Sequence, residues 1–308
     1  MLRAVIHAGL HKTATTSFQK CCSKLHLELI EQGIYYPLNN NSTNHNQLIG
    51  SPDLSWVPST VRDARSSAGS DGCLLLSAEN LEYHFHQDLP KQMEAALFRA
   101  GVKRVDWVLC FRNPFEAYSS LYGQLSLGRQ TIQGARSILQ FGATGHLIVA
   151  RHTLTLQSRA HTQHFYFNYP ALISDLRRKL KGQVLGISFK DFTKRANLPG
   201  DLLIQALARN REVFSDLSST LPNHRNSSPS HEQIERNYLR RFLGIDDSND
   251  NTDSDAGSEP AWFEQALKSR LNTRARQEGR IRRLFKRTFS DWNEATSSRQ
   301  EILRMLRP

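Results

Sequence analysis

Long apolar runs are absent from this chain of 308 residues, and cysteine is scarce. No stretch approaches the ~20 consecutive apolar residues that a membrane-spanning helix requires. The four cysteines contain no C-x-x-C pair and lie in apolar strand-like runs or on the first predicted helix; they are Cys21, Cys22, Cys73 and Cys110. We therefore expect buried free thiols and no metal site.

Acidic residues are also in short supply, with 29 Asp and Glu against 40 Lys and Arg, a net charge of +11. This excess predicts anionic ligands: a nucleotide with several phosphates, an acidic glycan, nucleic acid or a membrane surface. The N-terminus leaves no room for a signal peptide, because an apolar strand is predicted as early as Ala4–Ile6. We expect a cytoplasmic, globular enzyme with 39% hydrophobic and 22% charged residues.

Apolar runs of strand length alternate with amphipathic helical segments along the first two thirds of the chain. The predicted strands are Ala4–Ile6, Cys73–Ser77, Val105–Phe111 and Val184–Phe189, and helices follow near residues 18–29, 90–100, 114–122 and 170–180. This alternation predicts an α/β fold, a P-loop-like parallel sheet with helices on both faces. The segment from Tyr122 to Phe167 is predicted to be weakly helical.

Composition divides the chain into three parts. Residues 1–245 are predicted to form the α/β domain. Residues 246–260 carry six acidic and no basic residues, which indicates a flexible insertion. Residues 261–308 are expected to form basic helices packed on the same domain through an apolar stripe that includes Phe285 and Phe289. Their basic face is either merely solvated or a patch for an anionic acceptor or membrane surface.

The first strand runs into a short loop, Gly9-Leu-His-Lys-Thr-Ala-Thr-Thr16, and a helix follows directly. A strand, a tight loop and a helix N-terminus form an anion site, because the first helical turn offers free N–H groups and the positive end of the dipole. Lys12 adds a full charge. The alternative is an ordinary strand-to-helix turn with a solvated lysine.

A second strand-to-helix junction follows Phe111. Asn113 and Pro114 suit the N-cap and the first position of a helix. Arg112 precedes that helix, and Ser120 lies on the helix face that starts at Asn113, so the two side chains are predicted to converge on one ligand. The alternative is a capped helix beside a solvent-facing arginine.

Together the two junctions resemble the sulfotransferases that use 3′-phosphoadenosine 5′-phosphosulfate (PAPS), in particular bacterial, carbohydrate-sulfotransferase-like proteins. Residues 12–16 resemble the 5′-phosphosulfate loop, which commonly reads Lys-[Ser/Thr]-Gly-Thr-Thr, with Ala14 in place of the glycine. Arg112, with Glu116 four residues later and Ser120 eight residues later, resembles the 3′-phosphate motif. The resemblance covers Leu2 to about Phe192.

The resemblance implies sulfuryl transfer from PAPS to a hydroxyl or amine, on a carbohydrate or glycolipid, with adenosine 3′,5′-bisphosphate as the product. It implies no metal ion and no specific nucleic-acid partner. It also implies the residues that bind the donor: Gly9, Leu10, His11, Lys12, Thr13, Ala14, Thr15, Thr16, Arg112, Ser120 and, in a late loop, Arg225, Asn226 and Ser227. Lys12 would act in catalysis by stabilising the negative charge that develops on the oxygen between the sulfuryl group and the 5′-phosphate.

A hydroxyl acceptor needs a general base. Glu79 is the first candidate because it comes just after the strand Cys73–Ser77, at the sheet edge where ligands bind. His84 and His86 are the next candidates, and His11 is a further one. A structural role for Glu79, as a partner of Lys12 or as a helix cap, is the alternative.

Three other functions stay open at this point. A P-loop nucleotide kinase or NTPase would need G-x-x-x-x-G-K-[ST], which the first loop lacks. A non-catalytic basic protein that binds polyanions would explain the net charge but not the two junctions. An inactive sulfotransferase-like protein is compatible with Ala14.

Overall fold

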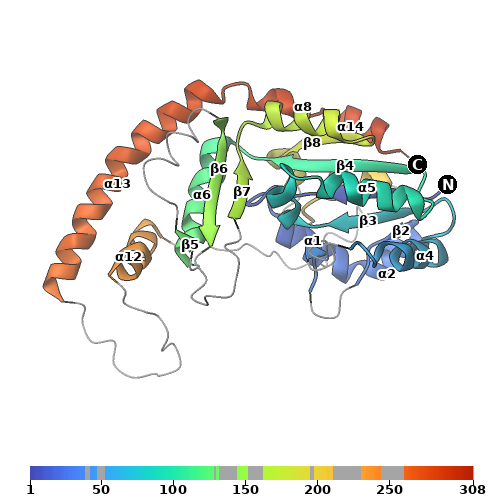
Figure 1. The fold of residues 1–308 in the computed structure, drawn as a ribbon, viewed down its shortest axis with the longest axis horizontal. Coiled ribbons are helices and arrows are strands. Elements are labelled where there is room, and N and C mark those ends of the chain that lie inside the picture. The colour runs from blue at the N-terminus through green and yellow to red at the C-terminus, as the bar shows by residue number, and fades with distance from the viewer. Residues whose placement is uncertain are drawn as a thin grey trace, which may run out of the picture.

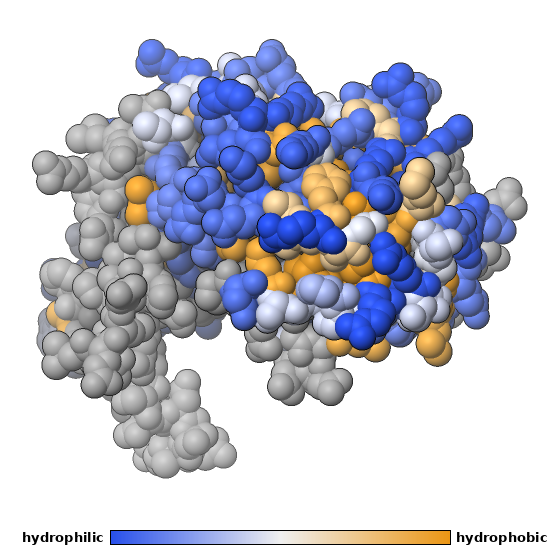
Figure 2. Space-filling model, turned by 45° about the vertical axis from the view of Figure 1, so that its right-hand side comes forward, coloured by the Kyte–Doolittle hydropathy of each residue, from blue (hydrophilic) through white to orange (hydrophobic). Residues whose placement is uncertain are grey.

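The structure is a computed structural model that describes residues 1–38, 42–46, 53–127, 130–131, 144–151, 162–194, 198–210, 230–243 and 260–307. A parallel sheet with its helices occupies one half of the molecule, and a small antiparallel sheet with three helices occupies the other (Figure 1). On the face shown in Figure 2, hydrophobic residues gather near the centre and hydrophilic ones surround them. Both termini lie in the half that holds the parallel sheet (Figure 1).

The parallel sheet has the order β2-β3-β1-β4-β8, and every neighbouring pair is parallel. Its strands are β1 (Arg3–His7), β2 (Ile34–Tyr35), β3 (Cys73–Ser77), β4 (Arg104–Phe111) and β8 (Gln183–Ser188). Strand β1 is central, with Val5 opposite Leu75 on one side and Asp106 on the other. Continuous apolar runs form these strands because both faces are buried.

Helices cover both faces of this sheet, so the predicted α/β class is confirmed. Ile6 and Leu76 face the side covered by α4 (Val57–Ala68), α5 (Leu89–Arg99), α8 (Tyr169–Lys179) and the 3₁₀ helix η2 (Trp292–Ala295). Val5 and Leu75 face the side covered by α1 (Thr15–Lys24), α2 (His26–Glu31), α9 (Phe189–Phe192), α10 (Asp201–Leu207) and α14 (Arg299–Met305).

The other half contains α6 (Pro114–Leu127), α12 (His231–Phe242), α13 (Ala261–Thr288) and the sheet β5-β6-β7, formed by β5 (Gln130–Thr131), β6 (His146–Arg151) and β7 (Thr162–Tyr166). The weak helix predicted from Tyr122 to Phe167 is wrong at β5, β6 and β7, because these strands form antiparallel pairs. In β6, buried Leu147 and Val149 alternate with half-buried His146 and Ile148, the period of a strand with one face on a core.

The C-terminal helices pack on both halves. Ile302 of α14 joins the core of the parallel sheet, while Phe285 and Phe289 join the cluster formed by α6, β6 and β7. The predicted insertion at 246–260 lies outside the described residues except for Pro260, and the domain boundaries stay a prediction. Among the described residues, no helix is both long enough and apolar enough to cross a membrane.

All four cysteines are buried and carry free thiols, as predicted. Burial raises the pKa of the Cys73 thiol to about 11 and that of the Cys110 thiol further. These thiols therefore act as small apolar side chains of the core.

Candidate functional site

The carboxyl ends of β1, β3 and β4 meet at one edge of the parallel sheet. After β1 the chain turns to α1 on one face, whereas after β3 it continues through η1 (Glu79–His84) to α5 on the other face. Open α/β sheets bind ligands at the point where the connections that follow two neighbouring strands go to opposite faces of the sheet. The loop Gly9–Thr16, Glu79 and Arg112 follow these three strands, and we call them together the strand-end site.

The loop that follows β1 is fixed against β4 by main-chain hydrogen bonds. Ala8 N–H donates to the Val108 carbonyl at 2.9 Å, and Leu10 N–H to the Cys110 carbonyl at 3.3 Å. Gly9 has φ +86°, and a Cβ at this position would lie 3.3 Å from the Cα of Glu79. Glycine here therefore allows the close approach that brings Glu79 beside the loop.

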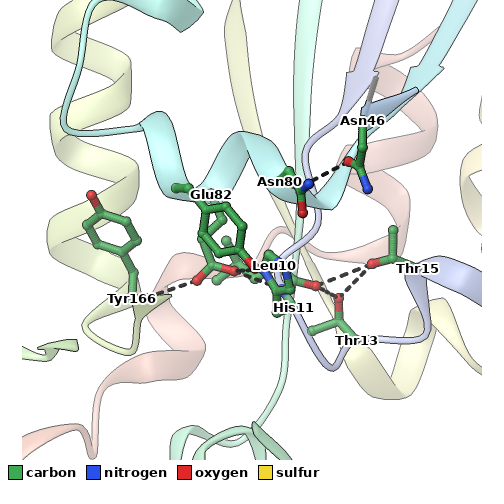
Figure 3. A network of polar contacts seen from close by, with 9 residues as sticks. Leu10, His11, Thr13, Thr15, Asn46, Asn80, Glu82 and Tyr166 are labelled. Carbon is green, nitrogen blue, oxygen red and sulfur yellow. Dashed lines mark hydrogen bonds and ion pairs between the residues drawn. The ribbon is translucent and has the colours of Figure 1, made fainter. Parts of the chain in front are cut away.

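Two threonine hydroxyls close the loop from within. Thr13 Oγ1 donates to the Leu10 carbonyl at 2.5 Å, and Thr15 Oγ1 donates to the same carbonyl at 3.2 Å (Figure 3). These two hydroxyls thus hold the turn itself. Among the described residues no side chain caps the N-terminus of α1, and its first turn contains no acidic residue. The backbone N–H groups of that turn are thus suited to an anion.

Ala14 occupies the position at which the sulfotransferase loop that this sequence resembles commonly has glycine. It has φ 63° and ψ 19°, in the left-handed region, and Lys12 also has a positive φ of 66°. A non-glycine residue in this region costs roughly 1–2 kcal/mol. The loop therefore keeps the backbone shape that glycine favours in spite of the alanine.

Replacing Ala14 with glycine is expected to raise the free energy of unfolding by about 0.5–1 kcal/mol. The change removes the left-handed strain, and the greater freedom of glycine in the unfolded chain offsets only part of the gain. Urea denaturation measures the difference. The matched control is Ala95→Gly at an exposed position of α5, which should destabilise by about 1 kcal/mol. Equal destabilisation by both variants would contradict the prediction.

Lys12 is half-buried at the centre of the strand-end site. Burial lowers the pKa of its amine, the negative charge of Glu79 opposes that effect, and the positive charge of Arg112 adds to it. Glu79 and Arg112 thus both lie within electrostatic reach of Lys12. The loop after β1 and Arg112 thus follow two adjacent strands, while their binding of one ligand stays a prediction.

Arg112 lies at the start of α6 in a partly screened position. Its Nε donates to Glu116 at 3.1 Å, and its guanidinium lies 4.9 Å from the centre of the Phe189 ring. Asn113 caps α6 by accepting hydrogen bonds from the N–H groups of Phe115 and Glu116, as predicted. Ser120 is half-buried and lies four residues after Glu116, hence in the same row of α6; its convergence with Arg112 stays a prediction.

His11 is bound to a carboxylate that the sequence analysis did not select. Glu82 is 2% exposed and accepts the backbone N–H of His11 at 2.8 Å, His11 Nδ1 at 2.7 Å and the Tyr166 N–H at 2.9 Å (Figure 3). The other ring nitrogen of His11 lies 2.8 Å from the Tyr83 hydroxyl. Glu82 thus ties the loop after β1 to η1 and β7.

The pKa of His11 reflects two opposing effects. Burial disfavours the charged ring, but the hydrogen bond and negative charge of Glu82 outweigh burial and raise the pKa above 6.5. Both ring nitrogens of His11 have partners, Glu82 and Tyr83, so the geometry supports a structural tie within the loop better than a role as a base.

The other predicted bases are spread over η1 and the residues just after it, with Glu79 at its start and the two histidines at and beyond its end. Glu79 begins η1 beside Gly9. His84 is hydrogen-bonded to Gln87 at 3.0 Å, and the ring of His86 stacks on His164 of β7 at 3.8 Å. The structure thus brings Glu79 to the loop and gives the two histidines other neighbours. Arg225, Asn226 and Ser227 lie outside the described residues.

A cavity of about 300 Å³ adjoins the first turn of α6. Asn113 and Glu116 line it from α6, and Arg282 and Lys286 line it from the end of α13. Glu116 also accepts the Arg112 hydrogen bond, so one side chain links this cavity to Arg112 of the strand-end site. The two basic residues from α13 were not predicted, because nothing local in the sequence relates α13 to α6.

Comparisons with known proteins leave the function open. No protein-family model matches the chain, and no curated protein matches it. Two solved structures are similar. A sulfotransferase from Alicyclobacillus acidocaldarius has 13% identity and a TM-score of 0.37, covering 79% of this chain and 92% of its own. A structure of the PezAT chromosomal toxin-antitoxin system of Streptococcus pneumoniae has 12% identity and a TM-score of 0.30, covering 71% and 85%. Likenesses this distant do not assign an activity.

Proposed function

We propose that this protein is a PAPS-dependent sulfotransferase that transfers a sulfuryl group to a hydroxyl of a carbohydrate or glycolipid acceptor. The observation that supports the proposal is that the Lys12 loop and Arg112 follow the adjacent parallel strands β1 and β4, with Leu10 N–H bound to the carbonyl of Cys110, two residues before Arg112. Each cation stands at a strand-to-helix junction whose sequence resembles one half of the sulfotransferase donor site. Two separate cationic positions suit a nucleotide with phosphates at both ends of its ribose.

The residues present fit such a donor. PAPS would supply the sulfuryl group and, in adenosine 3′,5′-bisphosphate, a leaving group whose 5′-phosphate gains negative charge. The N–H groups at the start of α1 would hold that phosphate, and Lys12 would neutralise the added charge more strongly in the transition state than before it. Arg112, with Ser120, would hold the 3′-phosphate.

Glu79 would accept the proton of the acceptor hydroxyl. Its backbone lies against Gly9, and its charge reaches both Lys12 and His11. A carboxylate beside the transferring group raises the nucleophilicity of a hydroxyl that it deprotonates. No step of this scheme requires a metal ion.

We expect adenosine 3′,5′-bisphosphate to bind more tightly than ADP, and Arg112→Ala to remove the difference. Charge-assisted hydrogen bonds contribute about 1.5–3 kcal/mol, so the variant should lose about 10- to 100-fold in affinity for the bisphosphate and little for ADP. Isothermal titration calorimetry measures both ligands. The fold should tolerate the change, because the Glu116 pair is exposed and such pairs contribute about 0–1 kcal/mol.

The matched control is Arg99→Ala, which removes an exposed arginine from α5. It should bind both nucleotides as the unaltered protein does. If the unaltered protein bound ATP more tightly than the bisphosphate, a kinase or NTPase would replace this proposal. Binding that ignored the 3′-phosphate and collapsed with salt would instead indicate a general polyanion-binding protein.

A further inference from the structure

The long helix α13 presents a row of arginines to solvent. Arg276, Arg280, Arg283 and Arg287 are exposed and recur at intervals of four, three and four residues, so they form one row on the helix surface. With a rise of 1.5 Å per residue, the row is about 16 Å long. In Figure 1, α13 follows the outer edge of the molecule, in the half away from the termini.

This row lies opposite the face by which α13 packs on the protein. The buried residues of α13 are Phe263, Leu267 and Phe285, and Phe285 is about half a turn from Arg283 and Arg287. At 3.6 residues per turn, the row therefore points directly away from the core. The arginines of the row therefore do not contribute to the packing of α13 on the protein.

The acidic residues of α13 do not neutralise the row. The helix contains nine Lys and Arg and two Glu. Glu264 pairs with Arg236 of α12, and Glu278 pairs with Arg282 on the flank of α13. In the described part of the chain, no carboxylate pairs with the four arginines of the row. With respect to the residues that the structure describes, the outward face of α13 thus carries uncompensated positive charge.

Large apolar side chains are exposed on the same helix. Trp262 is 55% exposed, and Leu284, which lies between Arg280 and Arg287 in the helical net, is 37% exposed. Trp262 lies on the same side of the helix as the row but 14 residues before Arg276, about 21 Å along the axis. Tryptophan, leucine and arginines on one solvent-exposed side are typical of helices that lie in the interface of an anionic membrane, where the rings and aliphatic chains enter the head-group region. Phosphate contacts to nucleic acid would use the arginines but leave both apolar side chains in water.

We propose that the outward face of α13 binds the protein peripherally to an anionic lipid surface. The arginine row would contact the lipid phosphates and carboxylates, while Trp262 and Leu284 enter the head-group region. Each arginine near such a surface contributes about fivefold to binding. The inference is independent of sulfuryl transfer, and its test needs no nucleotide.

The test measures co-sedimentation with vesicles of phosphatidylcholine alone and of an equimolar mixture with phosphatidylserine. We expect binding to the mixed vesicles only, and a loss of at least about 25-fold in the double variant Arg280→Glu, Arg283→Glu, since two arginines are removed. The matched control is Lys91→Glu, Arg99→Glu, which makes the same charge change at exposed positions of α5 and should retain binding. A thermal melt of each variant reports whether it is folded.

Tryptophan fluorescence gives a second readout. Trp262 should shift to shorter wavelength when mixed vesicles are added, and Trp262→Phe should abolish the shift. Equal losses in both double variants would show that only net charge matters and would overturn the proposal. It would also be overturned if the unaltered protein ignored the vesicles, or if a DNA duplex bound more tightly with the same dependence on Arg280 and Arg283.

Discussion

Lys12→Ala is expected to lower kcat for sulfuryl transfer by about 10²- to 10³-fold, the usual effect of removing one group that stabilises the charge of a transition state. Lys12 carries a full positive charge in the loop Gly9–Thr16, and it lies within electrostatic reach of both Glu79 and Arg112. The amine would act mainly on the leaving group, so the affinity for adenosine 3′,5′-bisphosphate should fall less than kcat. Transfer of labelled sulfate and calorimetry measure the two quantities.

The fold should survive this substitution. Lys12 has a positive φ, which alanine tolerates no worse than lysine, and its half-buried chain makes no hydrogen bond that closes the loop. The matched control is Lys190→Ala, which removes an exposed lysine next to Phe189, the ring beneath Arg112. Its turnover should be unchanged. Turnover of Lys12→Ala close to that of the unaltered protein would refute the proposed chemistry.

The sequence allowed the parallel sheet, and the approach of Glu79 to the Lys12 loop, to be predicted for one physical reason, whereas a shared ligand for Lys12 and Arg112 was implied only by the family resemblance. Strands buried on both faces require continuous apolar runs, such as Cys73–Ser77, and these stand out locally. Once such strands are parallel, their carboxyl ends share one edge, and residues that follow different strands come together there. Glu79 reached the site in the same way.

The antiparallel sheet and the role of Glu82 were not predicted, because their causes are not local. In β6 the alternation of Leu147 and Val149 is short and lies beside histidines that blur the pattern. In the sequence, Glu82 looks like an ordinary carboxylate on a helix surface. Its partner His11 is 71 residues away along the chain. A charged residue is buried when its partners satisfy it, and only the fold shows those partners.

Glu82→Ala is expected to lower the free energy of unfolding by about 3–5 kcal/mol, the usual effect of removing one partner from a buried charged pair. The variant would leave the N–H groups of His11 and Tyr166, and the His11 ring, without the carboxylate that accepts their hydrogen bonds. Urea denaturation measures the loss. The matched control is Glu79→Ala, three residues earlier on η1 and half-buried, which should change stability far less.

The pH dependence of Glu82→Gln tests whether the charge of the pair matters. The pKa of His11 is raised above 6.5 in the folded protein, so the stability that the pair contributes is fully present below pH 6.5 and is lost as the pH rises through the folded pKa. Glutamine keeps the size of the side chain but cannot hold the charged ring. The variant should therefore be destabilised more below pH 6.5 than in alkaline solution. A difference that stayed constant with pH would mean that Glu82 acts only through neutral hydrogen bonds, and that His11 is uncharged in the loop.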